Sequence, residues 1–422
     1  MSSIRFQLLS FMSLAHFIHH VELYAFPAMV ILISQEITMS YLEIGILGSL
    51  PILIMAITSP VIGYISKNAH LGFFMVLLGV LFFSLSSFMI SLSENYLHLV
   101  LGNFLLGLGC TTFHPVGLGL VANSFTGKTR GKAMAVNHAA GVIGTAVAPL
   151  GTLGLAIYIL GEWRQTFIFL GIFCLTLLIL MTAWMVIQNL GPRYSSLVEK
   201  INLDDHEDQV YSSPRLQYRN WILITLGIIL TISALRGGVY RLISYFTVTL
   251  LRDFYNVESF AAGIMTSFIL LMGSGSDIYG AYISDKSGSY GRVKIILVSA
   301  VGTCLAIIAL IFLTANFPEI WAILLGFSFF AVCFYLAGGT LQALMSDLVP
   351  QKSRTFFYSL VFSLGLVVSS TAPTIFGALL DVFQSPVAGF LFMLLLIFLS
   401  FFMTLLFQKR ITFAVEKDLI SP

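Results

Sequence analysis

Long apolar stretches alternate with short polar connections along the whole chain. Each stretch has the length of about 20 mainly apolar residues that an α-helix needs to cross the hydrocarbon core of a bilayer. The stretches are too long and too uniformly apolar for the alternating strands of an outer-membrane barrel. The pattern therefore predicts twelve membrane-spanning helices, at residues 6–33, 42–65, 71–92, 97–123, 133–159, 165–188, 221–249, 260–283, 293–314, 320–346, 355–380 and 386–407.

The longest polar connection, about residues 190–219, divides the predicted helices six and six. It contains Gly191-Pro192 and an acidic cluster at 204–208, which are typical of a solvated loop. We therefore predict an N-terminal six-helix bundle at 1–190, a cytoplasmic linker at 191–219 and a C-terminal six-helix bundle at 220–422.

Composition supports an all-α membrane protein embedded in the lipid bilayer. Of 422 residues, 58% are hydrophobic and only 9% are charged. A soluble domain usually has roughly 25% charged residues, so a soluble or disordered chain is excluded. The formal net charge of +2 gives no basic surface for nucleic acid, and no nucleic-acid partner is expected.

The basic residues predict the orientation of the helices. With the amino terminus in the cytoplasm, all basic residues lie in inner segments except four: Arg164, Arg252, Arg236 and Arg241. Cytoplasmic loops carry an excess of Lys and Arg, so both termini are predicted to be cytoplasmic.

The two halves of the chain resemble each other. The segment "FTGKTRGKAM" precedes "AVAPLG" in the first half, and "VPQKSRTFF" precedes "STAPTIFG" in the second. Arg130 precedes Pro149 by the same 19 residues that separate Arg354 from Pro373. Two parallel six-helix repeats are typical of transporters, in which two bundles rock around a central site.

The chain resembles the major facilitator superfamily. The loop "GAYISDKSGSYGRVK" matches the family's cytoplasmic motif through Gly280, Asp285, Lys286, Gly288, Arg292 and Lys294. The resemblance implies twelve helices in two bundles related by a pseudo-two-fold axis, with this loop latching neighbouring helix ends at a cytoplasmic gate. Arg130 and Arg354 are assigned to the same gate, whereas Lys67 stands where the matching amino-terminal loop should have an acid.

Within the superfamily, the amino-terminal half is similar to the fosmidomycin-resistance exporters. The matching segments are "SLAHFIHHVE", "SYLEIGILGSL" and "GLGCTTFHPVG", and the antiporter signature is degraded at Ala148. This resemblance implies proton-coupled antiport, with efflux of a small amphiphilic or anionic drug or metabolite. It also implies a monomer in the bacterial inner membrane without a cofactor or metal.

Away from the ends of the predicted spans, four acids or bases remain: Glu22, Arg236, Arg241 and Asp277. Placing such a group at the centre of a membrane helix costs about 2.5–3.5 kcal/mol even on the most lenient scale, so each is a functional candidate. Five of the eight histidines also lie away from the ends of the spans: His16, His19, His20, His114 and His138.

Glu22 and Arg236 have similar depths in their helices, at roughly 24 and 22 Å from the inner ends. We interpret Glu22 as the proton-coupling residue, with His19 and His20 tuning it. Arg236 is then its counter-ion or the substrate anchor. The alternative is a structural pair that only locks the two halves together.

The other candidates have weaker support. Arg241 lies about 140° around the helix from Arg236, so it either binds substrate or reaches to the outer interface. Asp277 and His138 have similar depths and are interpreted as a proton-sensitive gate contact, or Asp277 faces water. His16 is a substrate-binding candidate. His114 either contacts substrate or satisfies the carbonyl that Pro115 frees.

Three rival functions remain open. The spacing of His16, His19 and His20 resembles an iron-binding box of membrane oxidoreductases, but no second box is present. A channel or receptor fits the repeat less well than a carrier. Among carriers, a proton symporter that imports an organic acid or a metal-chelating metabolite would need the same residues as an exporter.

Overall fold

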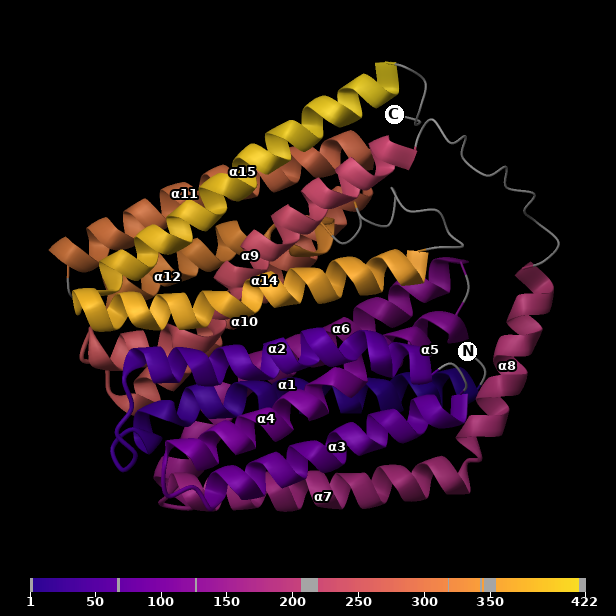
Figure 1. Ribbon diagram of the computed structural model, residues 1–422, viewed down its shortest axis with the longest axis horizontal. Coiled ribbons are helices and arrows are strands. Elements are labelled where there is room, and N and C mark those ends of the chain that lie inside the picture. Colours follow the sequence, from indigo (N-terminus) through magenta and orange to yellow (C-terminus); the bar gives the residue numbers. More distant parts are fainter. Residues whose placement is uncertain are drawn as a thin grey trace. The chain divides into compact units, whose positions relative to one another are not determined.

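The computed structural model is all-helical among the residues it describes, which are 3–66, 69–125, 127–205, 219–317, 319–341, 344 and 354–416. Figure 1 shows long helices joined mostly by short connections. Eleven helices are long and apolar enough to cross a membrane, and Tyr96–Thr112 is a shorter apolar helix. The chain divides into two compact units, residues 1–39 with 50–213 and residues 40–49 with 214–422.

The first unit is built mainly from seven helical elements and one surface helix. They are α1 (Ser3–Ile33), α2 (Tyr41–Ile65), α3 (Ala69–Ser91), α4 (Tyr96–Thr112), α5 (Leu118–Ser124), α6 (Gly127–Gly154), α7 (Trp163–Ile187) and α8 (Leu190–Asp205). The closest packing joins α1 to α6 and α3 to both α4 and α7. The first residues of α2 belong to the other unit.

The second unit repeats this arrangement. Its helices are α9 (Arg219–Asp253), α10 (Ser259–Asp285), α11 (Gly288–Asn316), α12 (Ile320–Tyr335), α14 (Arg354–Phe383) and α15 (Pro386–Glu416). Here α9 packs on α14, and α11 packs on both α12 and α15. These are the pairs that the sequence repeat predicts from the first unit, with α9 in place of α1 and α11 in place of α3.

The predicted span at 97–123 is not a continuous α-helix. Residues 97–123 form α4, a π-helical turn η1 (Phe113–Gly117) and α5. The turn contains Pro115, which has no backbone N–H to donate and so interrupts the α-helical hydrogen-bond pattern. The bend expected at Pro115 takes the form of a π-helical turn, and this turn sets the direction of His114.

The predicted linker also contains more structure than expected. Its first part forms α8, which packs against α3 and α5. Leu190 and Tyr194 are buried on one side of this helix, so its apolar positions give it a packing face. Residues 206–218, with Glu207 and Asp208, lie outside the described residues.

Candidate functional site in two parts

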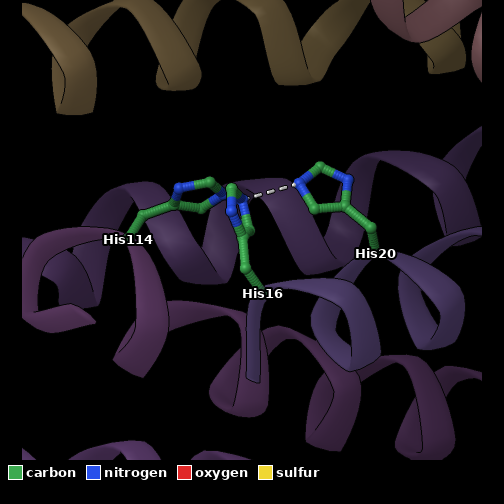
Figure 2. Close-up of side chains that lie close together, drawn as sticks. All are labelled: His16, His20 and His114. Atoms are coloured by element: carbon green, nitrogen blue, oxygen red, sulfur yellow. Dashed lines mark hydrogen bonds between the residues drawn. The ribbon is translucent and has the colours of Figure 1, made fainter. Parts of the chain in front are cut away.

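A cluster of four histidines lies inside the first unit. His16, His19 and His20 project from α1, and His114 comes from the turn η1. The ring centroid of His114 lies 4.7 Å from that of His19 and 5.5 Å from that of His16. His16 and His19 are almost fully buried. The interrupted helix therefore brings His114 to the residues predicted from α1 (Figure 2).

Helix α6 holds two of these rings in place. The backbone carbonyl of Asn137 lies 2.8 Å from His16 Nδ1, and Thr145 Oγ1 lies 2.8 Å from His20 Nδ1. Phe113 stacks on His16 with the ring centroids 4.6 Å apart. Sequence reasoning missed Asn137, Thr145 and Phe113, because their roles depend on how α1 and α6 pack.

Glu22 on α1 is buried against polar side chains of α3 and α7. Its carboxylate accepts hydrogen bonds from Ser87 Oγ at 2.7 Å and Cys174 Sγ at 3.1 Å. The residue is only 3% exposed, and no ion pair to it is found among the described residues. Both donors are neutral, so they stabilise the carboxylate less than a cationic partner would.

Arg236 lies at the centre of the second unit. Its Nη2 donates hydrogen bonds to the backbone carbonyl of Phe334 and, at 3.0 Å, to Ser299 Oγ. The guanidinium carbon lies 4.9 Å from the centre of the Phe334 ring, which adds a cation–π contact. The residue is 5% exposed.

The second terminal nitrogen of Arg236 has no hydrogen-bond partner among the described residues. Nη1 is buried and unpaired in the described structure, and no ion pair of Arg236 is found there. The N–H groups of a buried guanidinium normally all donate hydrogen bonds, because a buried charged donor without an acceptor destabilises the protein. The unpaired donor is therefore suited to an acceptor brought by a ligand.

Asp277 and Arg241 differ from Arg236 in their surroundings. Asp277 Oδ1 accepts a hydrogen bond from the backbone N–H of Gly339 at 2.6 Å, which joins α10 to the segment after α12. Arg241 is half-buried, with its guanidinium carbon 5.6 Å from the Tyr240 ring. His138 is exposed on α6. A His138–Asp277 contact would join the two units and stays a prediction.

The predicted cytoplasmic motif is placed at the junction of α10 and α11. Arg292 on α11 forms an ion pair with Asp285 at the end of α10, with 3.6 Å between Nη2 and Oδ1. Lys286 lies over the ring of Tyr282, at 4.1 Å. At Gly280 a Cβ atom would lie 1.9 Å from the Leu336 carbonyl, so the close helix contact requires glycine.

For the remaining motif residues, Gly288, Arg130 and Arg354, the described part of the structure gives no side-chain contacts that bear on the gate. Gly288 begins α11, and the side chains of Arg130 and Arg354 lie outside the described residues.

The sequence matches the Major Facilitator Superfamily over residues 12–373, and the chain belongs to this family. It is a multi-pass membrane protein and a secondary active transporter of small molecules, not an enzyme. The membrane oxidoreductase alternative is thereby set aside.

Several known transporters are similar to this chain. A probable L-galactonate transporter of Escherichia coli (strain K12) is 25% identical over 84% of this chain and 78% of its own length. A probable 4-methylmuconolactone transporter of Cupriavidus pinatubonensis is 24% identical over 76% of this chain and 72% of its own. A citrate-proton symporter of Salmonella typhi is 29% identical over 38% of this chain and 34% of its own.

Solved structures share the fold at low sequence identity. A bacterial homologue of the human lysosomal transporter Spinster, in an inward-facing and unoccupied conformation, superimposes with a TM-score of 0.78 at 14% identity, covering 100% of each chain. A D-xylose-proton symporter gives a TM-score of 0.74 at 15% identity, covering 95% of this chain and 97% of its own.

Proposed function

We propose that this protein is a proton-coupled carrier of a small organic anion, a carboxylate or a lactone-derived acid. The observation that carries the proposal is Arg236, a buried guanidinium with one unpaired terminal nitrogen. Guanidinium groups bind carboxylates through charge-assisted hydrogen bonds, and Nη1 has no other partner among the described residues, which makes Arg236 the proposed substrate anchor. The reported relatives support this class, since their names include L-galactonate and citrate.

Glu22 is the proposed proton carrier. Its buried carboxyl has two neutral hydrogen-bond donors and no basic partner among the described residues, so uptake of a proton is what would neutralise it. His19 and His20 lie on the same helix and are proposed to tune this step. Asp277 is a second proton candidate, and His16, His114, His138 and Arg241 remain candidates for substrate contact.

The proposed direction is import by symport. Among the relatives reported above, the one whose name states a coupling mode is a citrate-proton symporter. The antiport, efflux and drug-resistance roles expected from the resemblance of the amino-terminal half receive no support from these names. The proposed setting is a monomer in the bacterial inner membrane with both termini in the cytoplasm, as the basic loops predict.

Uptake into proteoliposomes tests the substrate class. Purified protein is reconstituted, and entry of labelled L-galactonate and citrate is measured with and without an inward proton gradient. The neutral sugar L-galactose serves as the control, because it has a similar carbon skeleton without the carboxylate. We expect saturable uptake of at least one acid, stimulated by the proton gradient, and none of the sugar. Equal uptake of the sugar and its acid would overturn the anion assignment.

A further inference from the structure

We propose that His16, His20 and His114 form a binding site for a divalent first-row transition-metal ion, with three imidazole ligands and an open fourth position. The site lies entirely within the first unit. The inference does not depend on the identity of the organic anion, and a metal was not expected from the sequence.

The spacing of the ligand atoms fits such an ion. One ring nitrogen of each histidine lies within 4.8 Å of those of the other two. The Nε2 atoms of His16 and His20 are 3.2 Å apart, as the dashed line in Figure 2 marks. Zn–N bonds of about 2.0–2.1 Å in a tetrahedron separate neighbouring nitrogens by roughly 3.3 Å. The His16–His20 pair therefore already has the required spacing, and a small rotation of His114 completes the set.

The backbone explains why these three residues converge. His16 and His20 are four residues apart on α1, so they lie one above the other on the same helix face. His114 belongs to the π-helical turn η1, where an extra residue in the turn changes the direction of the side chains. Sequence reasoning set the metal aside because it treated His114 as an isolated residue.

The outer contacts of His16 are those of a metal ligand. A carbonyl oxygen only accepts hydrogen bonds, so the contact from His16 Nδ1 to the Asn137 carbonyl requires the proton to be on Nδ1. In the neutral ring, Nε2 then presents a lone pair. Metal-binding histidines are commonly held in this way, with the second ring nitrogen bonded to a backbone carbonyl or another acceptor.

Thr145 arranges His20 similarly. Thr145 Oγ1 lies 2.8 Å from His20 Nδ1 and 3.2 Å from the Gly141 carbonyl. When its hydroxyl proton is directed to that carbonyl, the Thr145 oxygen accepts from His20 Nδ1, and this is the tautomer in which His20 Nε2 can bind a metal. Without a metal, the two Nε2 atoms share a hydrogen bond at 3.2 Å. With both ring protons on Nδ1, the two Nε2 lone pairs face each other, and a metal ion would take the place of the shared proton.

The chemistry of the ligands selects the class of ion. Neutral imidazoles bind Zn²⁺, Ni²⁺, Cu²⁺ and Fe²⁺ well, whereas Mg²⁺ and Ca²⁺ require oxygen ligands. Gly141 leaves room for the pair, because a Cβ atom there would lie 2.7 Å from His16 Nε2 and 2.9 Å from His20 Cδ2. The open fourth position is suited to water or to a carboxylate oxygen.

Titration with Zn²⁺ alone tests the site in the full-length protein purified in detergent. Against a competing chelator, we expect about one ion per chain, and at least tenfold weaker binding in His16→Ala, His20→Ala and His114→Ala. Thr145→Val removes only the outer contact and should weaken binding about tenfold. His98→Ala, a half-buried histidine outside the cluster, is the matched control and should bind as the unsubstituted protein does.

Two further readouts keep the test independent of folding defects and of transport. Co²⁺ bound to the unsubstituted protein should give the visible absorption of a tetrahedral site. Zn²⁺ should raise the melting temperature of the unsubstituted protein and of His98→Ala, but not of His20→Ala, since a ligand stabilises the state that binds it. If the unsubstituted protein bound no ion, the contact between His16 and His20 would be only a hydrogen bond, and the proposal would be overturned. Undiminished binding after substitution of both His16 and His20 would overturn it as well.

Discussion

The polar interiors of the two units hold different kinds of charge. The first unit contains imidazoles and one carboxyl, Glu22, whose charge changes with protonation or with metal binding. The second contains Arg236, whose guanidinium stays charged at every physiological pH. A carrier of anions that is driven by protons needs one fixed positive group and one titratable group. In the proposed mechanism, Arg236 of the second unit is the fixed group and Glu22 of the first unit is the titratable group, with Asp277 of the second unit the next titratable candidate.

The largest expected effect comes from removing the fixed charge. Arg236→Ala should lower kcat/KM for the organic anion by roughly 100-fold or more, since its charge-assisted hydrogen bond to the substrate is lost together with the positive charge. Arg236→Lys keeps the charge but not the geometry of the guanidinium donors, and should recover only part of the loss. Initial uptake rates in proteoliposomes measure both.

Arg252→Ala is the matched control, because this exposed arginine ends the same helix, α9. Normal transport by Arg236→Ala would mean that the fixed charge in the second unit has no part in anion binding.

The next largest effect is expected from Glu22→Gln, which should abolish proton coupling but not substrate exchange. Glu22→Gln preserves the size of the side chain and its contacts with Ser87 and Cys174, but it cannot carry a proton. One pH unit across the membrane is worth 1.36 kcal/mol, so electroneutral symport of a monoanion with one proton can accumulate substrate about tenfold. We expect Glu22→Gln to lose this accumulation while still exchanging labelled for unlabelled substrate.

Ser87→Ala keeps the carboxyl and should retain accumulation. Accumulation by Glu22→Gln equal to that of the unsubstituted protein would move the proton role to another group, with Asp277 the next candidate.

A pair of glycines tests how tightly each site is packed. A Cβ at Gly141 would meet His16 Nε2 at 2.7 Å, and one at Gly338 would meet Asp277 Oδ1 at 2.6 Å. Gly141→Ala and Gly338→Ala should each destabilise the protein by about 1–3 kcal/mol, because the neighbouring side chain must move. Melting temperatures in detergent measure the effect.

The chain offers a control for each glycine: Gly151 lies on α6 with Gly141, and Gly275 lies on α10 with Asp277, the residue that Gly338 contacts. At Gly151 on α6 the nearest atom would be 3.6 Å away, and at Gly275 on α10 nothing lies within 4 Å. If Gly151→Ala or Gly275→Ala shifted the melting temperature as much as their partners, close packing at the two sites would not explain the loss.

The smallest effect lies outside both sites. Glu36 accepts hydrogen bonds from Arg164 and Trp163, and the Arg164 guanidinium lowers the pKa of Glu36. A lowered folded-state pKa adds stability above the unfolded-state value, and this stability is lost as the pH falls through the folded-state value. The pair is largely exposed, so its contribution is below about 1 kcal/mol.

The stability that the Glu36–Arg164 pair contributes is measured by comparing the melting temperatures of Glu36→Gln and the unsubstituted protein at pH 7 and near pH 3. The melting temperatures should differ slightly at pH 7 and converge at the lower pH. A difference that grows in acid would contradict the sign of the effect.

The sequence predicts the membrane helices well because their length and polarity are local properties. The break at 113–117 was foreseen as a bend at Pro115, but the π-helical turn depends on hydrogen bonding that the residue types do not specify. The helical start of the linker was missed because its buried positions, Leu190 and Tyr194, are few and lie among polar residues.

The candidate residues were predictable, but their partners were not. A lone Glu or Arg in an apolar helix is visible at once, since burying it is costly. Ser87 and Cys174 around Glu22, and Ser299 and Phe334 around Arg236, lie on other helices. Which residues meet there depends on the rotation and register of each helix, and these are set by packing across the whole unit.

Luminal pH in proteoliposomes tests the central claim most directly. An inward gradient of the transported anion is imposed without a proton gradient, and an enclosed pH-sensitive dye reports proton movement. Symport predicts acidification of the lumen, absent in Arg236→Ala and Glu22→Gln although both proteins reconstitute normally. Anion entry with no change in luminal pH, or with alkalinisation as antiport requires, would contradict proton-coupled anion symport.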